Sequence, residues 1–183
     1  MAHREVSNMR MEQSGTGTGG SSERSVPITS AKEATSGEQR AARNKELMQT
    51  LDDAWNSQDL DTFENRHRAN VVVRWPGQPE THGVQAHRQE AIDFYRAFPN
   101  QRVGNRPYKM LIAQDDWTCS VARFTGTMTG PMKGPDGKDI PPTGKSFDVD
   151  FCTVAKWDDN GQIIEENLFY DLVTFMRQIG LSK

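Results

Sequence analysis

The chain has 183 residues, of which 34% are hydrophobic and 26% charged, so it can form one domain with a buried core and an additional segment. Its 22 basic and 25 acidic residues give a net charge of -3, which excludes the strongly basic surface that nucleic-acid binding requires. No apolar run approaches the roughly 18 residues of a membrane helix, and the N-terminus lacks the apolar region of a secretory signal. We therefore expect a cytoplasmic protein that binds neither nucleic acid nor membranes.

The first 38 residues differ from the rest of the chain in composition. They contain the run Gly-Thr-Gly-Thr-Gly-Gly-Ser-Ser at residues 15–22 and almost no aliphatic side chains. Such a segment cannot bury enough apolar surface to offset the entropy lost on ordering. A phosphate-binding loop is not favoured, because no strand pattern precedes the glycines. We predict a disordered N-terminal extension over residues 1–38 and one domain over residues 39–183.

Two helices are predicted to open the domain. From Ser36 onward, apolar residues recur at helical spacing with charged residues on the other face, and the pattern fades at Asn56. Asp59 is placed to cap a second, shorter helix that runs to about Arg66. The apolar face of the first helix, which we expect to pack on a sheet, consists of Leu47, Met48, Leu51, Ala54 and Trp55.

A strand and a third helix follow. Residues 70–75 include three consecutive valines and are followed by Pro76, which predicts a mostly buried strand. Trp75, at the strand end, is a candidate for stacking on a substrate. Arg74 is a candidate partner for an anion or a carbonyl group, or equally an exposed residue whose aliphatic stem covers a sheet edge. Apolar residues at helical spacing from residue 86 to 98 predict the third helix.

Three of the four histidines lie in the predicted domain, at His67, His82 and His87. His82 and His87 are five residues apart and form no His-x-x-x-His pair, so the spacing does not predict a zinc site. All three are candidates for acid/base work, because the unperturbed pKa of histidine lies near neutrality. His82, which precedes a glycine, is the one we expect to line a pocket.

The second half of the domain reads as successive strands. Residues 110–113, 117–127 and 147–157 carry strand patterns, separated by polar turns and one long loop. An antiparallel meander that follows helices indicates the α+β class. The loop from Gly130 to Gly144 is rich in proline and glycine, and so long a loop in a compact domain is usually functional or disordered. We expect it to act as a lid over a pocket.

The last predicted strand and helix contain the candidate catalytic residue. Asn160 and Gly161 suit a two-residue hairpin turn with positive φ at both positions. Residues 163–171 then read as a strand with two mixed faces, and we expect the face that carries Glu165, Asn167, Phe169 and Asp171 to line a pocket. A short helix follows, and Gly180 stands where it would stop.

Several phrases of the sequence resemble the SnoaL-like polyketide cyclases, also called ester cyclases. They are Phe-Thr-Gly-Thr from residue 124, Pro-Pro-Thr-Gly from residue 141 and Glu-Asn-Leu-Phe-Tyr-Asp-Leu from residue 166. The resemblance implies the nuclear transport factor 2-like fold, a cone-shaped curved antiparallel sheet with N-terminal helices that enclose one pocket. It also implies that Asp171, which matches the family's last-strand aspartate, is the general acid and base.

The resemblance further implies an enzyme without a cofactor. We expect acid/base chemistry on a small hydrophobic carbonyl compound, by aldol-type cyclisation or isomerisation, in a cytoplasmic homodimer that pairs through the outer face of the sheet. We expect apolar side chains around Asp171 to desolvate its carboxylate and raise its pKa. The candidate substrate-binding residues are Trp55, Arg74, Trp75, His82, Arg123, Phe151, Asn167 and Phe169.

Two alternatives stay open. The same fold hosts non-catalytic small-ligand-binding or dimerisation modules, in which Asp171 would only cap the last helix. It also hosts epoxide hydrolases, whose strand arginine is matched here by Arg123. Where those enzymes have a second aspartate, however, this sequence has Thr125.

Overall fold

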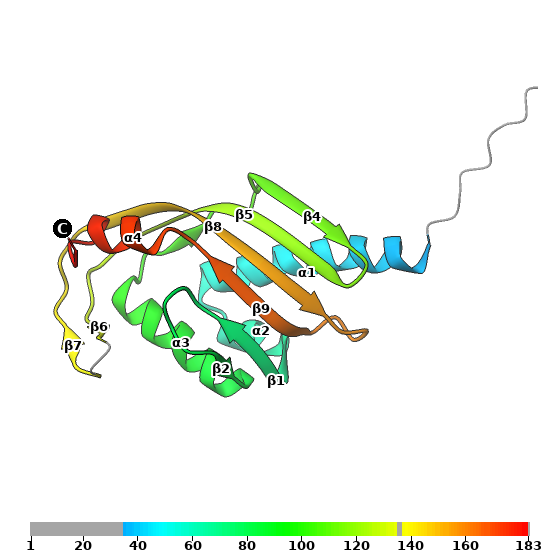
Figure 1. Ribbon diagram of the computed structural model, residues 1–183, viewed down its shortest axis with the longest axis horizontal. Helices are drawn as coiled ribbons and strands as arrows, with labels where there is room; N and C mark the ends of the chain where they lie inside the picture. Colours follow the sequence, from blue (N-terminus) through cyan, green and yellow to red (C-terminus); the bar gives the residue numbers. More distant parts are fainter. Residues whose placement is uncertain (1–34, 135–136, 183) are drawn as a thin grey trace, which may run out of the picture. The chain divides into compact units, whose positions relative to one another are not determined.

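The computed structural model describes residues 35–134 and 137–182, which form four helices and nine strands (Figure 1). The helices are α1 (Ser36–Ser57), α2 (Leu60–Asn65), α3 (Val84–Ala97) and α4 (Leu172–Gln178). The strands are β1 (His67–Arg74), β2 (Thr81–His82), β3 (Arg102–Val103), β4 (Met110–Gln114), β5 (Trp117–Thr127), β6 (Met132–Lys133), β7 (Asp139–Ile140), β8 (Ser146–Trp157) and β9 (Ile163–Phe169).

The predicted start of the first helix at Ser36 and the predicted cap of the second at Asp59 are confirmed, and the structure adds a cap that was not predicted. Thr35 and Glu38 form a capping box at the start of α1, in which the Thr35 hydroxyl accepts a hydrogen bond from the Glu38 amide at 3.3 Å. Asp59 caps α2 by accepting a hydrogen bond from the Thr62 amide at 3.1 Å. The predicted N-terminal extension lies outside the described residues, except for the four residues at 35–38 that begin α1. No helix in the described part of the chain is long and apolar enough to cross a membrane.

The main sheet is mixed rather than wholly antiparallel. Its strand order is β2-β1-β9-β8-β5-β3, and β4 also pairs with β5. β5 and β8 form the long antiparallel centre, whereas β1 and β9 run parallel. Parallel pairing requires a long connection, and here α3 and the other five strands of the sheet lie between β1 and β9 in the sequence. The α+β class is confirmed, and the expectation of an all-antiparallel sheet is wrong for this one pair.

The turn before β9 also differs from the prediction. Of the Asn160-Gly161 pair, only Gly161 has a positive φ, at 76°. The Gly161 amide donates to the Asp158 carbonyl at 3.1 Å, and the Asp158 amide donates to the Gln162 carbonyl at 2.8 Å. This is a three-residue loop with glycine in the left-handed position, not a two-residue turn.

One face of the sheet is covered by α1, α2 and α3, while α4 packs against β8 (Figure 1). Alternate residues of each long strand point to the covered face, as the period of two requires. In β5 these include Ala122 and Phe124, and in β8 Val149 and Phe151, all buried. The space between helices and sheet is filled largely by aromatic rings, namely those of Trp55, Phe63, Phe94, Phe98, Phe124, Phe147 and Phe151.

The segment from Gly130 to Gly144 has local structure of its own in its described part. β6 and β7 pair as a small antiparallel hairpin, which contacts α3. Arg96 of α3 forms an ion pair with Asp139 at 3.1 Å, and the Gly130 amide donates to the Ala97 carbonyl at 3.1 Å. Its role as a lid stays a prediction, since none of its described residues lines the pocket under α1.

Candidate functional site

A small pocket lies between the helices and the inner face of the sheet. Its volume is about 30 Å³, which is close to the share of liquid volume taken by one water, about 30 Å³. Most of its wall is aromatic or aliphatic, with four polar side chains. The lining residues are Leu51, Asp52, Trp55, Phe63, Trp75, His87, Val103, Phe124, Phe151, Thr153, Glu166 and Leu168.

α1 contributes a carboxylate to this pocket. Asp52 and Trp55 are three residues apart, so they share the helix face that packs on the sheet. The Tyr108 hydroxyl donates a hydrogen bond to Oδ2 of Asp52 at 2.6 Å, which fixes the carboxylate and leaves Oδ1 for another partner. Burial raises the pKa of Asp52 from 3.8 to about 7; the hydrogen bond from Tyr108 opposes this, and the nearby charge of Glu166 adds to it.

Trp55 supplies a hydrogen-bond donor beside Asp52. Its indole is 7% exposed and packs against Tyr95 at 4.8 Å and Phe94 at 5.6 Å between ring centroids. Its Nε1 is buried and has no hydrogen-bond partner among the described residues. A buried N–H without a partner carries an energetic penalty, which an acceptor atom placed at this nitrogen would remove.

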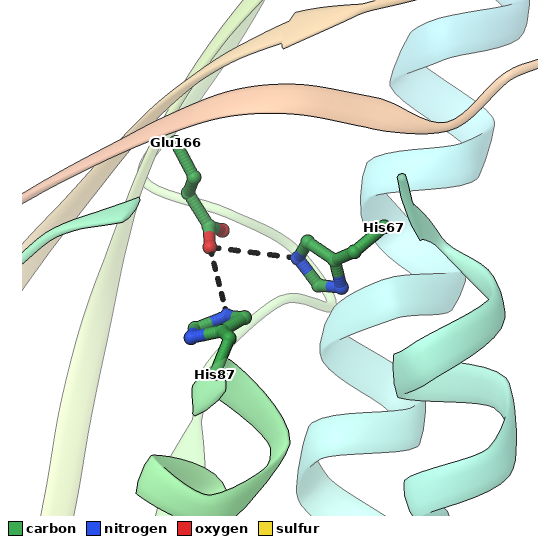
Figure 2. A group of neighbouring side chains, drawn as sticks. All are labelled: His67, His87 and Glu166. Carbon is green, nitrogen blue, oxygen red and sulfur yellow. Dashed lines mark ion pairs between the residues drawn. The ribbon is translucent and has the colours of Figure 1, made fainter. Parts of the chain in front are cut away.

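A second polar group is formed by Glu166 and two histidines (Figure 2). Oε2 of Glu166 lies 3.2 Å from Nε2 of His87 and 3.5 Å from Nε2 of His67. All three side chains are at least nine-tenths buried. Burial favours the neutral carboxyl, but the two neighbouring imidazoles outweigh it and hold the pKa of Glu166 well below its ordinary value. Burial lowers the pKa of His87, yet Glu166 and Glu90 together raise it to about 9.

Glu90 of α3 connects this group to the pocket wall. Its Oε2 accepts hydrogen bonds from Nδ1 of His87 at 2.9 Å and from Nε1 of Trp75 at 3.0 Å. The Thr81 hydroxyl donates to its other oxygen. His67 is fixed from the other side, because its Nδ1 lies 2.7 Å from the Phe63 carbonyl. Both imidazole rings are therefore held through Nδ1 and present Nε2 to Glu166.

The structure brings three of the predicted site residues to the pocket, namely Trp55, Trp75 and Phe151. The others lie outside it. The residues that the sequence prediction placed at the site but that do not line the pocket are Arg74, His82, Arg123, Asn167, Phe169 and Asp171.

Asp171 is the main correction. It is the exposed N-cap of α4, where Oδ1 accepts a hydrogen bond from the Thr174 amide at 2.9 Å and Oδ2 accepts one from the Thr174 hydroxyl at 2.6 Å. These bonds hold the pKa of Asp171 below its ordinary value, whereas a pocket base was expected to have a raised pKa. Asp171 thus caps the last helix, and the prediction that its carboxylate lies beside the cavity is wrong.

The choice of face on β9 is also wrong. Glu165, Asn167 and Phe169 point away from the pocket, and Phe169 is 54% exposed. Arg74 lies with the first two on the outer face, since its guanidinium contacts Glu165 at 2.7 Å and Asn167 at 3.1 Å. The residues between them, Glu166 and Leu168, line the pocket instead.

The remaining two candidates are surface residues. Arg123 points outward from β5 and forms an ion pair with Asp148 at 2.5 Å, so its support for an epoxide hydrolase is lost. The His82 side chain is 68% exposed and lies 3.5 Å from Glu80. His82 therefore lies at the edge of the sheet rather than in the pocket.

Sequence reasoning missed Asp52 and Glu166 as pocket groups. It named His67 and His87 as acid/base candidates but favoured His82, whereas His87 is the histidine that lines the pocket. One signal was present for Asp52: with Met48, Leu51 and Trp55 it completes the helical stripe at spacings of three and four, so a carboxylate interrupts an apolar face. The Glu166 group had no comparable signal. Its members lie on β1, α3 and β9, and only the fold brings them together.

A curved mixed sheet, covered on one face by N-terminal helices over a pocket, is the architecture of the nuclear transport factor 2-like class. A sequence profile of the SnoaL-like polyketide cyclases matches residues 45–179. The chain belongs to that family.

Solved structures support the same assignment. A protein described as a SnoaL-like polyketide cyclase, from Jannaschia Sp. CCS1, is 25% identical with a TM-score of 0.68, over 78% of this chain and 95% of that one. IdmH from Streptomyces antibioticus, described as a polyketide cyclase, is 21% identical with a TM-score of 0.61, over 75% and 99%. An LEH-like epoxide hydrolase from M. tuberculosis is 13% identical with a TM-score of 0.59, over 76% and 90%. The last two show the fold alone. The search of curated proteins finds no match.

Proposed function

We propose that the protein is an acid/base enzyme that removes and returns a proton beside the carbonyl group of a hydrophobic compound, with aldol-type cyclisation or isomerisation as the outcome. The observation that carries the proposal is Asp52: a carboxylate with a pKa of about 7 in an aromatic pocket, beside the unpaired N–H of Trp55. A base with a pKa near the working pH is the most effective kind for proton transfer.

The roles follow from the positions. The Asp52 carboxylate takes the proton from the carbon next to the carbonyl, and the electron pair of that C–H bond forms the enolate. The Trp55 N–H donates a hydrogen bond to the enolate oxygen, whose negative charge grows during this step. In a conjugated enolate, Asp52 then returns the proton to a different carbon, which isomerises the compound. Alternatively, the enolate carbon attacks a second carbonyl, whose oxygen takes the proton from Asp52. Tyr108 keeps the carboxylate in place, and neither step requires a cofactor.

The size of the pocket bears on the substrate. A volume of about 30 Å³ is far below the roughly 300–1,000 Å³ of ordinary ligand pockets. A substrate with a carbon ring must therefore displace some of the aromatic side chains. Trp75 is the half-buried member of the wall, and its ring packs 6.3 Å from that of Phe151. We propose that this pair moves when a ligand enters.

The small volume also favours a second candidate, a non-catalytic module of the same fold that binds a small ligand or dimerises. In that case the raised pKa of Asp52 would be a consequence of burial without a chemical use. A test of proton transfer distinguishes the two candidates.

The test measures exchange of protons for deuterons in D₂O by NMR, over a panel of aromatic ketones and 1,3-dicarbonyl compounds. The exchange of the carbon-bound proton reports the first step, whatever the final product. With any compound that exchanges faster in the presence of the protein, Asp52→Asn should slow the catalysed exchange by about 10²- to 10⁴-fold. Asp53→Asn is the matched control, because Asp53 is the next residue and pairs with Arg106 outside the pocket.

The wild-type rate should also rise with pH through a midpoint near 7 as Asp52 ionises. If the panel gives no catalysed exchange, or if Asp52→Asn exchanges as fast as the wild type, the non-catalytic candidate is the better description.

A further inference from the structure

The group formed by His67, His87 and Glu166 has a second interpretation beyond an ion-pair network (Figure 2). We propose that Nε2 of His67, Nε2 of His87 and the carboxylate of Glu166 together bind one divalent first-row transition-metal ion such as Zn²⁺. The site departs from the expectation of a protein without a cofactor. It uses neither Asp52 nor Trp55 as a ligand.

The spacing of the donor atoms fits a metal ion. Oε2 of Glu166 is 3.2 Å from Nε2 of His87 and 3.5 Å from Nε2 of His67, and the three ligand atoms lie within 4.8 Å of one another. With metal–ligand bonds of about 2.0–2.2 Å, neighbouring ligand atoms of a tetrahedral or octahedral site are roughly 2.9–3.6 Å apart. The two distances from Glu166 thus already match those of a first coordination shell, and the two Nε2 atoms lie within 4.8 Å of each other.

The orientation of both rings fits as well. A backbone carbonyl only accepts hydrogen bonds, so Nδ1 of His67 must carry the proton that it shares with Phe63. Nδ1 of His87 likewise donates to Oε2 of Glu90, which also accepts from Trp75. In a neutral imidazole the other nitrogen is then a lone pair. When both imidazoles are neutral, the two Nε2 lone pairs therefore face Oε2 of Glu166, at 3.2 Å for His87 and 3.5 Å for His67. Neither Nε2 makes a hydrogen bond within the described residues.

Three electron-pair donors that face one another in a buried space repel, and a cation between them removes the repulsion. A proton on His87 does so in the metal-free protein, in keeping with its raised pKa, and a metal ion would take the place of that proton. The metal is favoured by the fixed Nδ1 contacts, because histidines that bind metals usually donate their second ring N–H to a carboxylate or a backbone carbonyl. His87 has the first kind of partner and His67 the second.

The site would retain an open side. His87 and Glu166 line the pocket, whose volume of about 30 Å³ accommodates one water. Two histidines, one carboxylate and a water are the ligand set of catalytic rather than structural zinc. An ion here would face the pocket and act as a Lewis acid towards an oxygen atom of a bound ligand.

The experiment uses the full chain, purified without a polyhistidine tag and treated with a chelator. Co²⁺ is titrated while the visible absorption that reports its coordination geometry is recorded, and Zn²⁺ is then added in competition. We expect one equivalent of Co²⁺ with tetrahedral-type absorption, its displacement by Zn²⁺, and a melting temperature that rises with either metal.

The variants divide the four histidines into two pairs. His67→Asn, His87→Asn and Glu166→Gln should each weaken binding on the order of 100-fold or more, since each removes a ligand. His3→Asn and His82→Asn should leave it unchanged. Glu165→Gln, on the opposite face of β9 from Glu166, is the matched carboxylate control.

Buried variants can fail to fold, so a residue outside the ligand set provides a second arm. Glu90→Gln keeps all three ligands but removes the carboxylate that orients His87. It should weaken binding by roughly 10- to 100-fold, with the metal-free melting temperature as a check on folding. The proposal is overturned if the wild type binds no stoichiometric metal. It is equally overturned if the ligand variants bind as the wild type does, and the group is then an imidazolium–carboxylate pair.

Discussion

Replacement of Asp52 by asparagine should stabilise the protein above neutral pH while abolishing the proposed proton transfer. The pKa of Asp52 is raised from 3.8 to about 7, chiefly by burial. A raised carboxyl pKa means that the folded state favours the protonated form, so ionisation of this group opposes folding. Asparagine is nearly isosteric and neutral at every pH. Its side-chain oxygen can still accept the hydrogen bond from Tyr108.

The magnitude follows from the two pKa values. Below pH 3.8 Asp52 is protonated in both the folded and the unfolded state, so it contributes no pH dependence. As the pH rises, the unfolded chain releases the proton first, and the free energy of unfolding of the wild type falls by about 1.4 kcal/mol per pH unit. The fall ends once the folded state also ionises, near pH 7. Between pH 5 and pH 8, the stability advantage of the variant should therefore grow by about 3 kcal/mol.

Urea unfolding at several pH values, followed by the fluorescence of the four tryptophans, measures this difference. Asp53→Asn is the control with the opposite sign. Hydrogen bonds from Arg106 lower the pKa of Asp53, so its loss should destabilise the protein at pH 8 by about 0.2–1 kcal/mol, the range for exposed ion pairs. A difference between Asp52→Asn and wild type that does not vary with pH would refute the raised pKa and with it the choice of base.

Three further predictions concern other parts of the molecule. Trp55→Phe keeps an aromatic ring but removes the donor, so the deuterium-exchange rate should fall by about 10²-fold or more; an unchanged rate would exclude Trp55 as the oxyanion donor. The Asp171→Asn variant should catalyse deuterium exchange at the wild-type rate, because Asp171 is exposed and asparagine caps helices equally well. A large loss of this rate would show that Asp171 is catalytic. We expect a homodimer through the outer face of the sheet, so light scattering should give twice 20.6 kDa, and Val154→Glu on the outer side of β8 should give the monomer. A monomeric wild type would contradict the dimer.

Much of the architecture was predictable, because the four helices and the five longer strands each have a local signal, whereas the two-residue strands β2, β3, β6 and β7 have none. β5 has the predicted bounds at residues 117–127, and α2 begins after the predicted cap, Asp59. Trp55, Trp75 and Phe151 were correctly placed at the pocket. Large aromatic residues on inward faces or at strand ends have few other positions in a small domain.

The polar part of the pocket was not predictable in the same way. Both faces of β9 carry a glutamate and apolar residues, so the alternation defines two faces without showing which one is buried. Glu166 is buried because His67 and His87, which are 99 and 79 residues earlier in the sequence, compensate its charge. Glu165 stays outside with Arg74 at 2.7 Å. Partners from distant segments thus determine which face is buried, and the sequence of the strand alone does not identify them.

The pKa shifts of the two pocket carboxylates are linked. Neighbouring imidazoles hold Glu166 in the ionised form, and its negative charge is one of the causes that raise the pKa of Asp52. Two carboxyl groups with pKa values displaced in opposite directions are a common arrangement of acid/base sites, in which one group stays charged and the other exchanges a proton. A divalent cation at Glu166 would reverse the sign of the charge near Asp52 and lower its pKa. The pH window in which Asp52→Asn gains stability should therefore shift downward when Zn²⁺ is present. A window that stays in place with Zn²⁺ bound would show that the ion lies elsewhere than beside this pocket.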